Sequence, residues 1–337
     1  MKTAVITGIA GQDGAFLAQL LLEKGYYVIG ADRRRVDSHY WRLADLGIVE
    51  KINFVYFDLL EHSNIVELIK KYQPDEFYNL AAQSFVKASF DLPIMTSEVD
   101  AMGVLKILDA LKHYSPNTKF YQASTSEMFG KVQCTPQNET TPFYPRSPYG
   151  VAKLFAHWMV INYRESYNLF ACSGILFNHE SEYRGSEFVT QKIIESVVRI
   201  ECGKQDFIEL GNLDSKRDWG YAKDYVEGMY LMLQQDKADD YVLATNKTES
   251  VRSFVEKAFN SIGRNIIWKG NGIDEIGICS ATQNILVKIN PDFYRPTEVD
   301  LLIGDYSKAQ NKLGWQPQTD LKKLIAIMMK KARLRIV

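Results

Sequence analysis

A tyrosine and a lysine stand four residues apart in the stretch that runs from Ser147 to Lys153, Ser-Pro-Tyr-Gly-Val-Ala-Lys. On a helix this spacing places the side chains of Tyr149 and Lys153 on one face. A neighbouring cation favours the phenolate, so we expect a lowered pKa for Tyr149. Such a phenolate can take a proton from a sugar hydroxyl while a hydride leaves the same carbon. The same pair also occurs in helices with no catalytic role, so other residues must support this chemistry.

A threonine and a glutamate could complete it. A strand over Lys119–Ala123 is expected to deliver Ser124-Thr125-Ser126-Glu127 at its carboxyl end, the edge where open α/β sheets bind ligands. Thr125 and Glu127 are two residues apart, so both side chains should start on the same side of the strand. The hydroxyl is suited to a sugar oxygen and the carboxylate to a carbon-bound proton. Taken alone, the glutamate is better explained as a cap for the next element.

The first 32 residues read as strand, glycine-rich turn, helix and strand. The strands are expected over Thr3–Thr7 and Tyr27–Asp32, with a helix that ends at Gly25. Glycines in such a turn allow close backbone approach, and the helix N-terminus offers free N–H groups to a pyrophosphate. In this context the pattern favours dinucleotide binding over an empty structural turn. The turn consists of Gly8, Ile9, Ala10, Gly11, Gln12, Asp13 and Gly14.

The residues that follow give conflicting indications about the dinucleotide. Asp32 closes the second strand, where a carboxylate accepts hydrogen bonds from ribose hydroxyls and favours NAD. Arg33, Arg34 and Arg35 come next and could instead bind the 2′-phosphate of NADP. These arginines are also compatible with a solvated loop or a subunit contact. We favour NAD.

Strands and helices continue to alternate, which predicts a Rossmann-type, doubly wound parallel sheet. A further strand is expected over Ile52–Phe57, and the residues that follow it, Asp58 and Leu59, are expected beside the adenine. Another is expected over Glu76–Leu80 and runs into Ala81, Ala82, Gln83 and Ser84. A third is expected over Ala171–Phe177. A long amphipathic helix is expected over Val99–His113. Residues 264–300 look irregular, and a final helix should start near Leu321.

The composition bounds the class of protein. The chain has 337 residues and a formal net charge of −1, so no basic field argues for nucleic acid or an anionic membrane. Four cysteines without a C-x-x-C motif suit a reducing cytoplasm, and five dispersed histidines indicate no metal site. We find neither a signal peptide nor an apolar run long enough to span a bilayer. We therefore expect a cytoplasmic protein with a small-molecule substrate.

Several stretches carry a resemblance that covers nearly the whole chain. The sequence resembles the extended short-chain dehydrogenase/reductases and, within them, the GDP-mannose 4,6-dehydratases. The matching stretches are Thr7–Gly14, Tyr78–Ser84, Ala123–Glu127, Pro145–Lys153, Phe177–Ser181, Gly211–Trp219 and Arg295–Asp300. The resemblance implies a dinucleotide-binding domain over residues 1–177 and about 212–245. A smaller, mixed α/β lobe for the nucleotide sugar would comprise residues 178–211 and 246–337, interleaved with the first.

The resemblance also implies roles for individual residues. Thr125, Glu127, Tyr149 and Lys153 match catalytic positions, and Lys153 would also hold the nicotinamide ribose. Cofactor contacts beyond residues 8–14 are implied for Asp58, Leu59, Leu80, Ala81, Ala82, Ser84, His179 and Arg184. Contacts to a GDP-sugar are implied for Ser84, Glu127, Tyr149, Asn178, Lys192, Arg217, Arg295 and Glu298. A guanidinium suits a diphosphate, although Arg217 and Arg295 are also compatible with surface ion pairs.

Together these groups suggest a dehydration that regenerates its cofactor. A hydride leaves carbon 4 of the sugar, and the resulting ketone acidifies the hydrogen on carbon 5. Glu127 removes that hydrogen, the carbon 6 hydroxyl departs as water, and the hydride returns at carbon 6. In the family, the loop that matches Arg33 to His39 reaches the cofactor site of a neighbouring subunit, which implies a homotetramer built as a dimer of dimers.

Departures from the family pattern lead to a hypothesis about the substrate. Phe85 replaces a common histidine, Met95 a common tyrosine, and Ser181–Gly185 differs from the usual arginine-rich run. We expect the changes at Phe85 and Met95 to alter the room and polarity around the substituent at carbon 6. The hypothesis is therefore a GDP-D-glycero-alpha-D-manno-heptose 4,6-dehydratase, which would supply a 6-deoxy-4-keto heptose for a capsule polysaccharide, with GDP-mannose as the alternative substrate.

Two other classes of function stay open. A nucleotide-sugar 4-epimerase or 4-keto reductase of the same fold would need Tyr149 and Lys153 but no base placed like Glu127. A nucleotide-sensing regulator would keep the fold without catalysis, but such proteins often lose the tyrosine or the lysine. Related dTDP-sugar dehydratases carry an aspartate where this chain has Ser126, which is a far weaker acid. The proton for the departing water would then come from Glu127 or from bound water.

Overall fold

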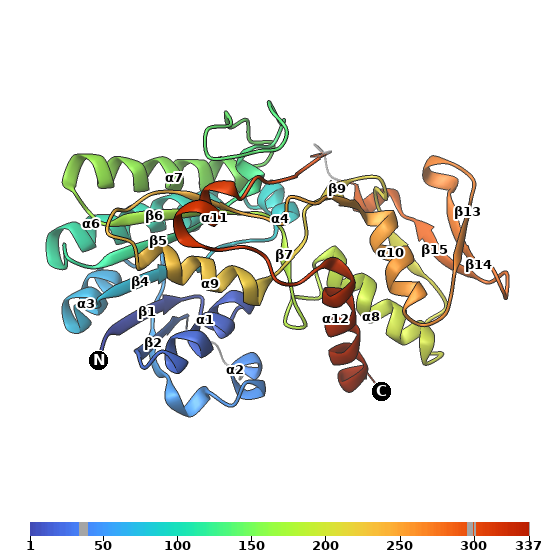
Figure 1. Cartoon of the computed structure of the whole chain (residues 1–337), viewed down its shortest axis with the longest axis horizontal. Coiled ribbons are helices and arrows are strands. Elements are labelled where there is room, and N and C mark those ends of the chain that lie inside the picture. Colours follow the sequence, from blue (N-terminus) through green and yellow to red (C-terminus); the bar gives the residue numbers. More distant parts are fainter. Residues whose placement is uncertain (34–39, 295–298, 300, 337) are drawn as a thin grey trace.

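A parallel sheet forms the centre of the larger lobe in the computed structural model, which describes residues 1–33, 40–294, 299 and 301–336 (Figure 1). Within these residues the sheet has seven strands in the order β11-β6-β5-β4-β1-β2-β3, and every pair is parallel. The strands are β1 (Thr3–Thr7), β2 (Tyr27–Asp32), β3 (Asn53–Tyr56), β4 (Glu76–Asn79), β5 (Lys119–Thr125), β6 (Ala171–Leu176) and β11 (Tyr241–Leu243). The predicted doubly wound α/β architecture is confirmed.

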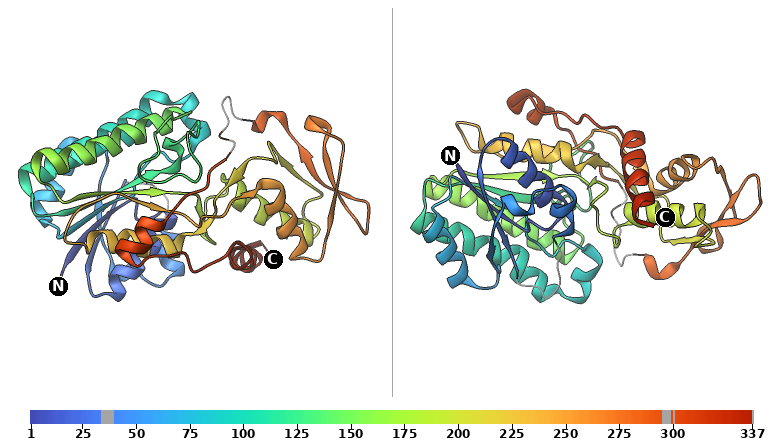
Figure 2. Two further views of the ribbon diagram at one scale, coloured as in Figure 1. Left: turned by 45° about the horizontal axis from the view of Figure 1, so that its top comes forward. Right: turned by 90° about the horizontal axis from the view of Figure 1, so that it is seen from below.

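Helices cover both faces of this sheet, because successive residues of each strand point to opposite sides. Ala4 and Ile6 of β1 pack with α1 (Gln12–Glu23) and α9 (Ala222–Leu233) in one apolar cluster. Val5 packs on the other side in a cluster with α3 (His62–Tyr72), α6 (Gly103–Tyr114) and α7 (Pro148–Tyr167). The strands are thus buried on both faces, and they point their carboxyl ends towards the smaller lobe (Figures 1 and 2).

The smaller lobe contains a second sheet, and here the sequence-based expectation was wrong. Residues 264–300 were expected to be irregular, yet they supply β13 (Ile266–Lys269), β14 (Ile276–Cys279) and β15 (Ile285–Ile289). In the described residues these strands pair antiparallel, and β15 then pairs parallel with β8 (Ile208–Leu210). Each strand is short, and the sheet is completed by β8, which lies more than seventy residues before its partner β15 in the chain. The hydrophobic pattern of residues 264–300 therefore gave little indication of this sheet.

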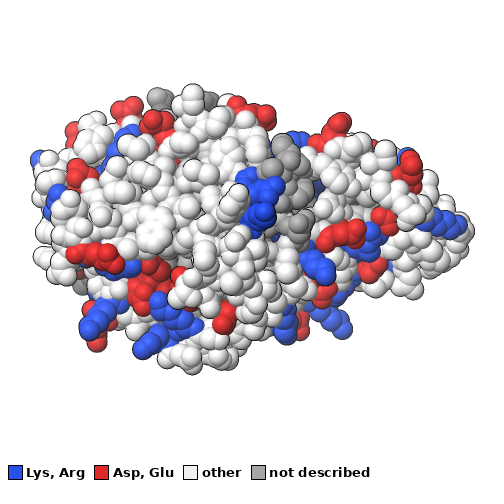
Figure 3. Space-filling model, turned by 90° about the horizontal axis from the view of Figure 1, so that it is seen from above, with Lys and Arg blue, Asp and Glu red and all other residues white. Residues whose placement is uncertain are grey.

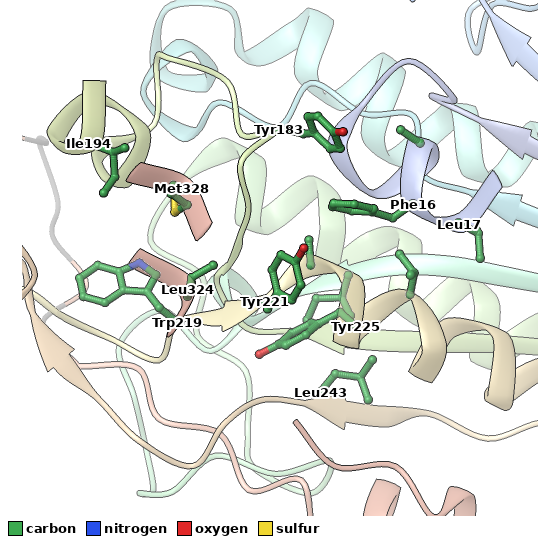
Figure 4. Packing of buried hydrophobic residues seen from close by; sticks show 14 of the residues in the cluster. Phe16, Leu17, Tyr183, Ile194, Trp219, Tyr221, Tyr225, Leu243, Leu324 and Met328 are labelled. Atoms are coloured by element: carbon green, nitrogen blue, oxygen red, sulfur yellow. The ribbon is translucent and has the colours of Figure 1, made fainter. Parts of the chain in front are cut away.

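An apolar cluster joins the two lobes beneath the site. Phe16 of α1 lies 5.2 Å from Tyr183, measured between ring centroids, and Tyr221 lies 6.0 Å from Phe16. Farther along, Trp219 and Leu324 belong to the same cluster, which extends into α8 (Val189–Glu201), α10 (Val251–Asn260) and α12 (Leu321–Ile336) (Figure 4). Burial of this many aromatic and aliphatic side chains holds the smaller lobe in place against the sheet.

The chain crosses between the lobes more than once. The expected final helix is present as α12 and packs on α8, whereas α11 (Ser307–Leu313) packs on α9 and β11 in the larger lobe. We propose two interleaved units close to the expected division, with α11 assigned to the dinucleotide side. None of the helices in the described part of the chain has both the length and the apolar character needed to cross a membrane.

Candidate active site

A cavity of about 800 Å³ lies where the carboxyl ends of the central strands meet the smaller lobe. Its walls come from segments that are far apart in the sequence. They include the turn after β1, the residues that follow β4 and β5, the start of α7, and segments of the smaller lobe as far as Phe293. The predicted residues that line it are Gly8, Gly11, Gln12, Asp13, Gly14, Leu80, Ala82, Ser84, Thr125, Glu127, Tyr149, Lys153, Asn178, His179, Arg184, Lys192 and Arg217.

The start of α7 places Tyr149 and Lys153 in this cavity. The Ser147 hydroxyl accepts a hydrogen bond from the Gly150 N–H at 3.0 Å, and Pro148 occupies the first turn. Tyr149 and Lys153 are 8% and 3% exposed. The Lys153 Nζ donates a hydrogen bond to the Ala123 carbonyl at 3.0 Å and lies 5.8 Å from the centroid of the Tyr149 ring. The helical spacing thus brings the pair together as predicted.

The expected lowering of the tyrosine pKa is not found. Burial raises the pKa of Tyr149, and the carboxylates of Asp100 and Glu127 raise it further. The Thr125 hydroxyl and the Arg184 cation act in the opposite direction. Burial also lowers the pKa of Lys153, and Asp100 opposes this effect. The expectation was wrong because the loss of hydration on burial outweighs the favourable charges around the phenol.

Thr125 and Glu127 lie next to this pair, but not both on the strand. β5 ends at Thr125, and Glu127 belongs to a 3₁₀ turn, η3 (Ser126–Met128). The Thr125 Oγ1 accepts a hydrogen bond from the Glu127 N–H at 3.2 Å and caps that turn. The group that caps this turn is therefore the threonine hydroxyl. Both side chains are 9% exposed and line the cavity.

The glycine-rich turn has the shape of a dinucleotide cradle. Gly8 has a φ of +68°, and a Cβ built on it would lie 2.9 Å from the Ala81 nitrogen. A Cβ on Gly14 would lie 2.4 Å from the Gly8 carbonyl oxygen. Larger residues would therefore disrupt the turn that opens α1 towards the cavity. This backbone suits the pyrophosphate of a nicotinamide dinucleotide.

An ion pair locks this turn to the strand that enters the smaller lobe, β7 (His179–Glu180). The His179 Nε2 lies 2.8 Å from Asp13 Oδ2, and its Nδ1 lies 2.7 Å from the Phe177 carbonyl oxygen. Both ring nitrogens thus face acceptors, which favours the protonated imidazolium. Burial opposes both charges, yet the pairing raises the pKa of His179 and lowers that of Asp13. The two predicted cofactor residues therefore hold each other in place.

The remaining predicted cofactor residues occupy more varied positions. The Ala81 N–H donates a hydrogen bond to Thr7 Oγ1 at 3.1 Å, so Ala81 supports the turn from behind. Ile9 and Leu59 are buried in the apolar core. The Asp58 carboxylate accepts a hydrogen bond from the Leu60 N–H. The residues that do not line the cavity are Ile9, Ala10, Asp32, Arg33, Asp58, Leu59 and Ala81, and Arg34 lies outside the described residues.

Basic side chains gather on the wall formed by the smaller lobe. Arg217 is 8% exposed, so it is not a surface residue, and its Nη1 donates to the Val299 carbonyl at 2.6 Å. The Lys192 Nζ lies 3.7 Å from the Phe293 ring centroid. The Arg184 guanidinium lies 3.5 Å from the ring centroid of Phe188 and pairs with Glu180. Arg295 and Glu298 lie outside the described residues.

Sequence reasoning missed other residues of this region. Lys87, Phe188 and Phe293 line the cavity, and Asp100 is buried behind it. The sequence did contain one sign of Asp100. It lies four residues before Val104 and seven before Ile107, so on a helix its carboxylate falls on the apolar face. Among the described residues, no group of three or more His, Cys, Asp or Glu side chains is placed to hold a metal ion.

Comparison with known proteins identifies the family. Residues 5–328 match the family model described as GDP-mannose 4,6 dehydratase. The chain belongs to the GDP-mannose 4,6-dehydratase family. Members of this family are NAD(P)-dependent hydro-lyases, and the chain is a GDP-sugar 4,6-dehydratase of this kind. This conclusion agrees with the convergence of Thr125, Glu127, Tyr149 and Lys153 on the cavity.

Relatives of this family match nearly the whole chain. The GDP-mannose 4,6 dehydratase of Drosophila melanogaster is 54% identical over 98% of this chain and 85% of its own length. The protein of the same name from Homo sapiens is 52% identical, with 97% and 90% covered. Among solved structures, the UDP-glucose 4-epimerase of Thermus thermophilus in complex with NAD superposes with a TM-score of 0.81, at 22% identity and with 98% and 99% covered. At that identity the likeness supports the fold alone.

The Asp13–His179 ion pair should stabilise the folded protein only within a range of pH. The stability that the raised pKa of His179 contributes is fully present below the ordinary pKa of 6.5. It is lost as the pH rises through the raised pKa of the folded protein. The stability that the lowered pKa of Asp13 contributes is fully present above the ordinary pKa of 3.8. It is lost as the pH falls through the lowered pKa of the folded protein. We expect Asp13→Asn to lower the free energy of unfolding by about 3 kcal/mol within that range, and by less at high pH, in urea titrations at a series of pH values.

An exposed pair of the same kind provides the control. His113 and Asp109 lie 3.5 Å apart, with side chains 54% and 43% exposed. Asp109→Asn should change the free energy of unfolding by less than about 1 kcal/mol at every pH. An Asp13→Asn effect that is the same at pH 5 and pH 9 would contradict the assignment of a charged pair.

Proposed function

We propose that this enzyme is a GDP-mannose 4,6-dehydratase that produces GDP-4-keto-6-deoxymannose and water. The observation that carries the proposal is the convergence of Thr125, Glu127, Tyr149 and Lys153 beside the glycine-rich cradle in one cavity. Thr125 offers a hydroxyl and Glu127 a base. Tyr149 offers a proton acceptor and Lys153 a cation. The names of the relatives at about 50% identity support GDP-mannose as the sugar nucleotide.

The heptose hypothesis finds no support in the comparisons, and we replace it with its alternative. The relatives that match the chain carry the name GDP-mannose 4,6-dehydratase, including that of Yersinia enterocolitica at 49% identity. One of the two substitutions behind the hypothesis is also remote from the cavity, because Met95 does not line it and is 37% exposed. Phe85 does line it and lies 6.1 Å from the ring of Phe188.

The first step assigned to these residues is proton removal from the hydroxyl on carbon 4. Tyr149 is the acceptor assigned to this proton. Burial raises its pKa, and the Thr125 hydroxyl and the Arg184 cation act in the opposite direction, towards the phenolate that the step requires. Lys153 keeps its ammonium next to the phenol and donates to the Ala123 carbonyl. A bound nicotinamide dinucleotide supplies the acceptor for the carbon 4 hydride and the donor that returns this hydride at carbon 6.

The second step is the loss of water across carbons 5 and 6. Glu127 removes the proton from carbon 5, which the ketone at carbon 4 has made acidic. The same carboxyl group then protonates the departing carbon 6 hydroxyl, because Ser126 is too weak an acid for that task. After hydride return, carbon 5 takes up one proton from solvent, and Tyr149 releases to solvent the one that it accepted from the carbon 4 hydroxyl. The sum is the removal of one water molecule.

The cofactor is proposed to be NAD. Gly8, Gly11 and Gly14 would hold its pyrophosphate, and Lys153 its nicotinamide ribose. Asp32 ends β2 and accepts a hydrogen bond from the Arg33 N–H at 2.8 Å. A carboxylate at this position opposes a 2′-phosphate. Solved structures of the same fold include an epimerase in complex with NAD and an RMD protein of Pseudomonas aeruginosa complexed with NADPH.

We further propose a cytoplasmic homotetramer. Val151, Phe155 and Trp158 form one exposed apolar stripe on α7, and the neighbouring α5 (Pro93–Ser97) exposes Ile94 and Met95. Apolar areas of this size on a soluble protein usually mark an interface. The larger lobe shows a broad area with few charged groups on the side of α7 (Figure 3). A second copy related by a two-fold axis would cover such a stripe with its own.

Mass spectrometry of the products tests the substrate. Purified enzyme is incubated separately with GDP-mannose and with GDP-D-glycero-D-manno-heptose, first without added cofactor and then with NAD or NADP. We expect GDP-mannose to lose 18 mass units through release of water, and the heptose to react far more slowly. Faster turnover of the heptose would restore the earlier hypothesis. No loss from either sugar would move the assignment to an epimerase or a reductase.

Replacement of Glu127 separates dehydration from oxidation. Glu127→Gln should reduce water loss by about 10²- to 10⁴-fold, the usual contribution of a general acid–base group. Oxidation at carbon 4 should persist and appear as cofactor absorbance at 340 nm. Ser126→Ala is the control and should keep dehydration near the level of the unaltered enzyme. Equal loss of water in Glu127→Gln and the unaltered enzyme would exclude the proposed base.

The oligomeric proposal is tested by light scattering after gel filtration. We expect the unaltered protein to have the mass of four 38.6 kDa chains. Trp158→Glu places a charge in the apolar stripe and should give smaller species, because a buried charge without a partner is costly. Tyr56→Glu, at a 71% exposed position on β3, should leave the mass unchanged. An unchanged mass for Trp158→Glu would exclude this surface as an interface.

A further inference from the structure

A buried carboxylate interrupts the helical run behind the cavity wall. Asp100 is the middle residue of a π-turn, η2 (Glu98–Met102), which joins α5 directly to α6. Its side chain is buried, at 1% exposure. Such turns replace regular helical hydrogen bonds and are frequent at functional sites. The sequence predicted an uninterrupted helix from Val99, whereas the structure has this π-turn before α6. A buried charge contributes nothing to apolar packing, so Asp100 needs another explanation.

The two oxygens of this carboxylate have different environments. Oδ1 accepts a hydrogen bond from the Gln83 backbone N–H at 2.8 Å. Oδ2 is also buried and makes no hydrogen bond with the described part of the chain. Buried carboxylate oxygens are nearly always paired, because leaving one unpaired is costly. Asp100 therefore anchors the Leu80–Ser84 segment through Gln83 and still has one oxygen uncommitted at the back of the site.

The charges around Asp100 belong to the groups proposed for the reaction. The π-turn packs on α7, which carries Tyr149 and Lys153. Burial raises the pKa of Asp100 to about 6, and the Lys153 cation opposes that rise. In return, Asp100 raises the pKa of Lys153 against the effect of burial. Asp100 also acts on Tyr149: after burial it is the largest cause of the raised pKa of that phenol, Glu127 adds to the rise, and the Thr125 hydroxyl and the Arg184 cation oppose it.

Lys153 has particular need of such a counter-charge. The hydrogen bond described for its ammonium is to the Ala123 carbonyl, a neutral group. A buried ammonium without a negative partner tends to lose its proton. Asp100 is the charge that acts against this loss in the described residues. An asparagine could accept the hydrogen bond from Gln83 equally well, so the property that a carboxylate adds at this position is its charge.

We propose that Asp100 is a positioning residue of the dehydratase reaction, which keeps Lys153 a cation beside Tyr149 and holds the Leu80–Ser84 backbone against the cavity. It acts through Lys153 and Gln83 and is not itself placed to touch the sugar. This inference rests on the proposed function, because the reaction is what makes the charge of Lys153 matter.

The variant Asp100→Asn tests this role, since it keeps the hydrogen-bond acceptor and removes the charge. Without its counter-charge, Lys153 should lose its proton at lower pH. We expect the basic limb of the kcat–pH profile with GDP-mannose to move down by about one pH unit, with kcat reduced about tenfold above that limb. The KM for GDP-mannose should stay within about twofold of the unaltered enzyme, because no substrate contact is removed.

The matched control is Glu98→Gln, which removes an exposed carboxylate from the same π-turn and should leave the profile unchanged. Asp100→Glu restores a charge and should return the basic limb towards its original pH. If Asp100→Asn does not fold, as judged by thermal unfolding, Asp100→Ser takes its place with the same expectation. A charge-removing variant that folds and keeps the original basic limb would overturn the inference. Failure of the unaltered enzyme to release water would overturn the proposed function instead.

Discussion

The burial of an ammonium group beside a phenol is the interaction on which the rest of this site depends. Lys153 is 3% exposed, and a charge at such a position costs several kcal/mol unless other groups compensate it. The Ala123 carbonyl and the Asp100 charge provide this compensation. They come from β5 and from the π-turn before α6, so the central sheet and its covering helices must be in place before the pair can exist.

The second requirement is a stable junction between the lobes, because the cavity has walls from both. The Asp13–His179 pair ties the glycine-rich turn to β7, and the aromatic cluster around Tyr221 packs below it. Arg217 is held from the same side by the Val299 carbonyl. These contacts hold basic groups of the smaller lobe in the wall of the same cavity that the proposed catalytic residues line.

The chemistry that the fold supports is decided by few residues. Epimerases and dehydratases of other nucleotide sugars superpose on this chain with TM-scores of 0.81 and 0.80, so the fold does not separate these reactions. The feature to which we attribute dehydration, as proposed above, is the Glu127 carboxylate in the short turn after β5. Thr125 caps that turn through its hydroxyl and so sets the direction of Glu127.

Local features of the sequence determined a large part of this protein. The glycine-rich turn, the i, i+4 pair of Tyr149 and Lys153, and the alternation of strands and helices depend on neighbouring residues, and each was predicted correctly. The sheet formed by β13–β15 with β8, the rise in the pKa of Tyr149 and the pairing of Asp13 with His179 were decided only by tertiary structure. Pairing between distant strands, desolvation and charge partners across lobes depend on atoms that are far apart in the chain, so no local pattern encodes them.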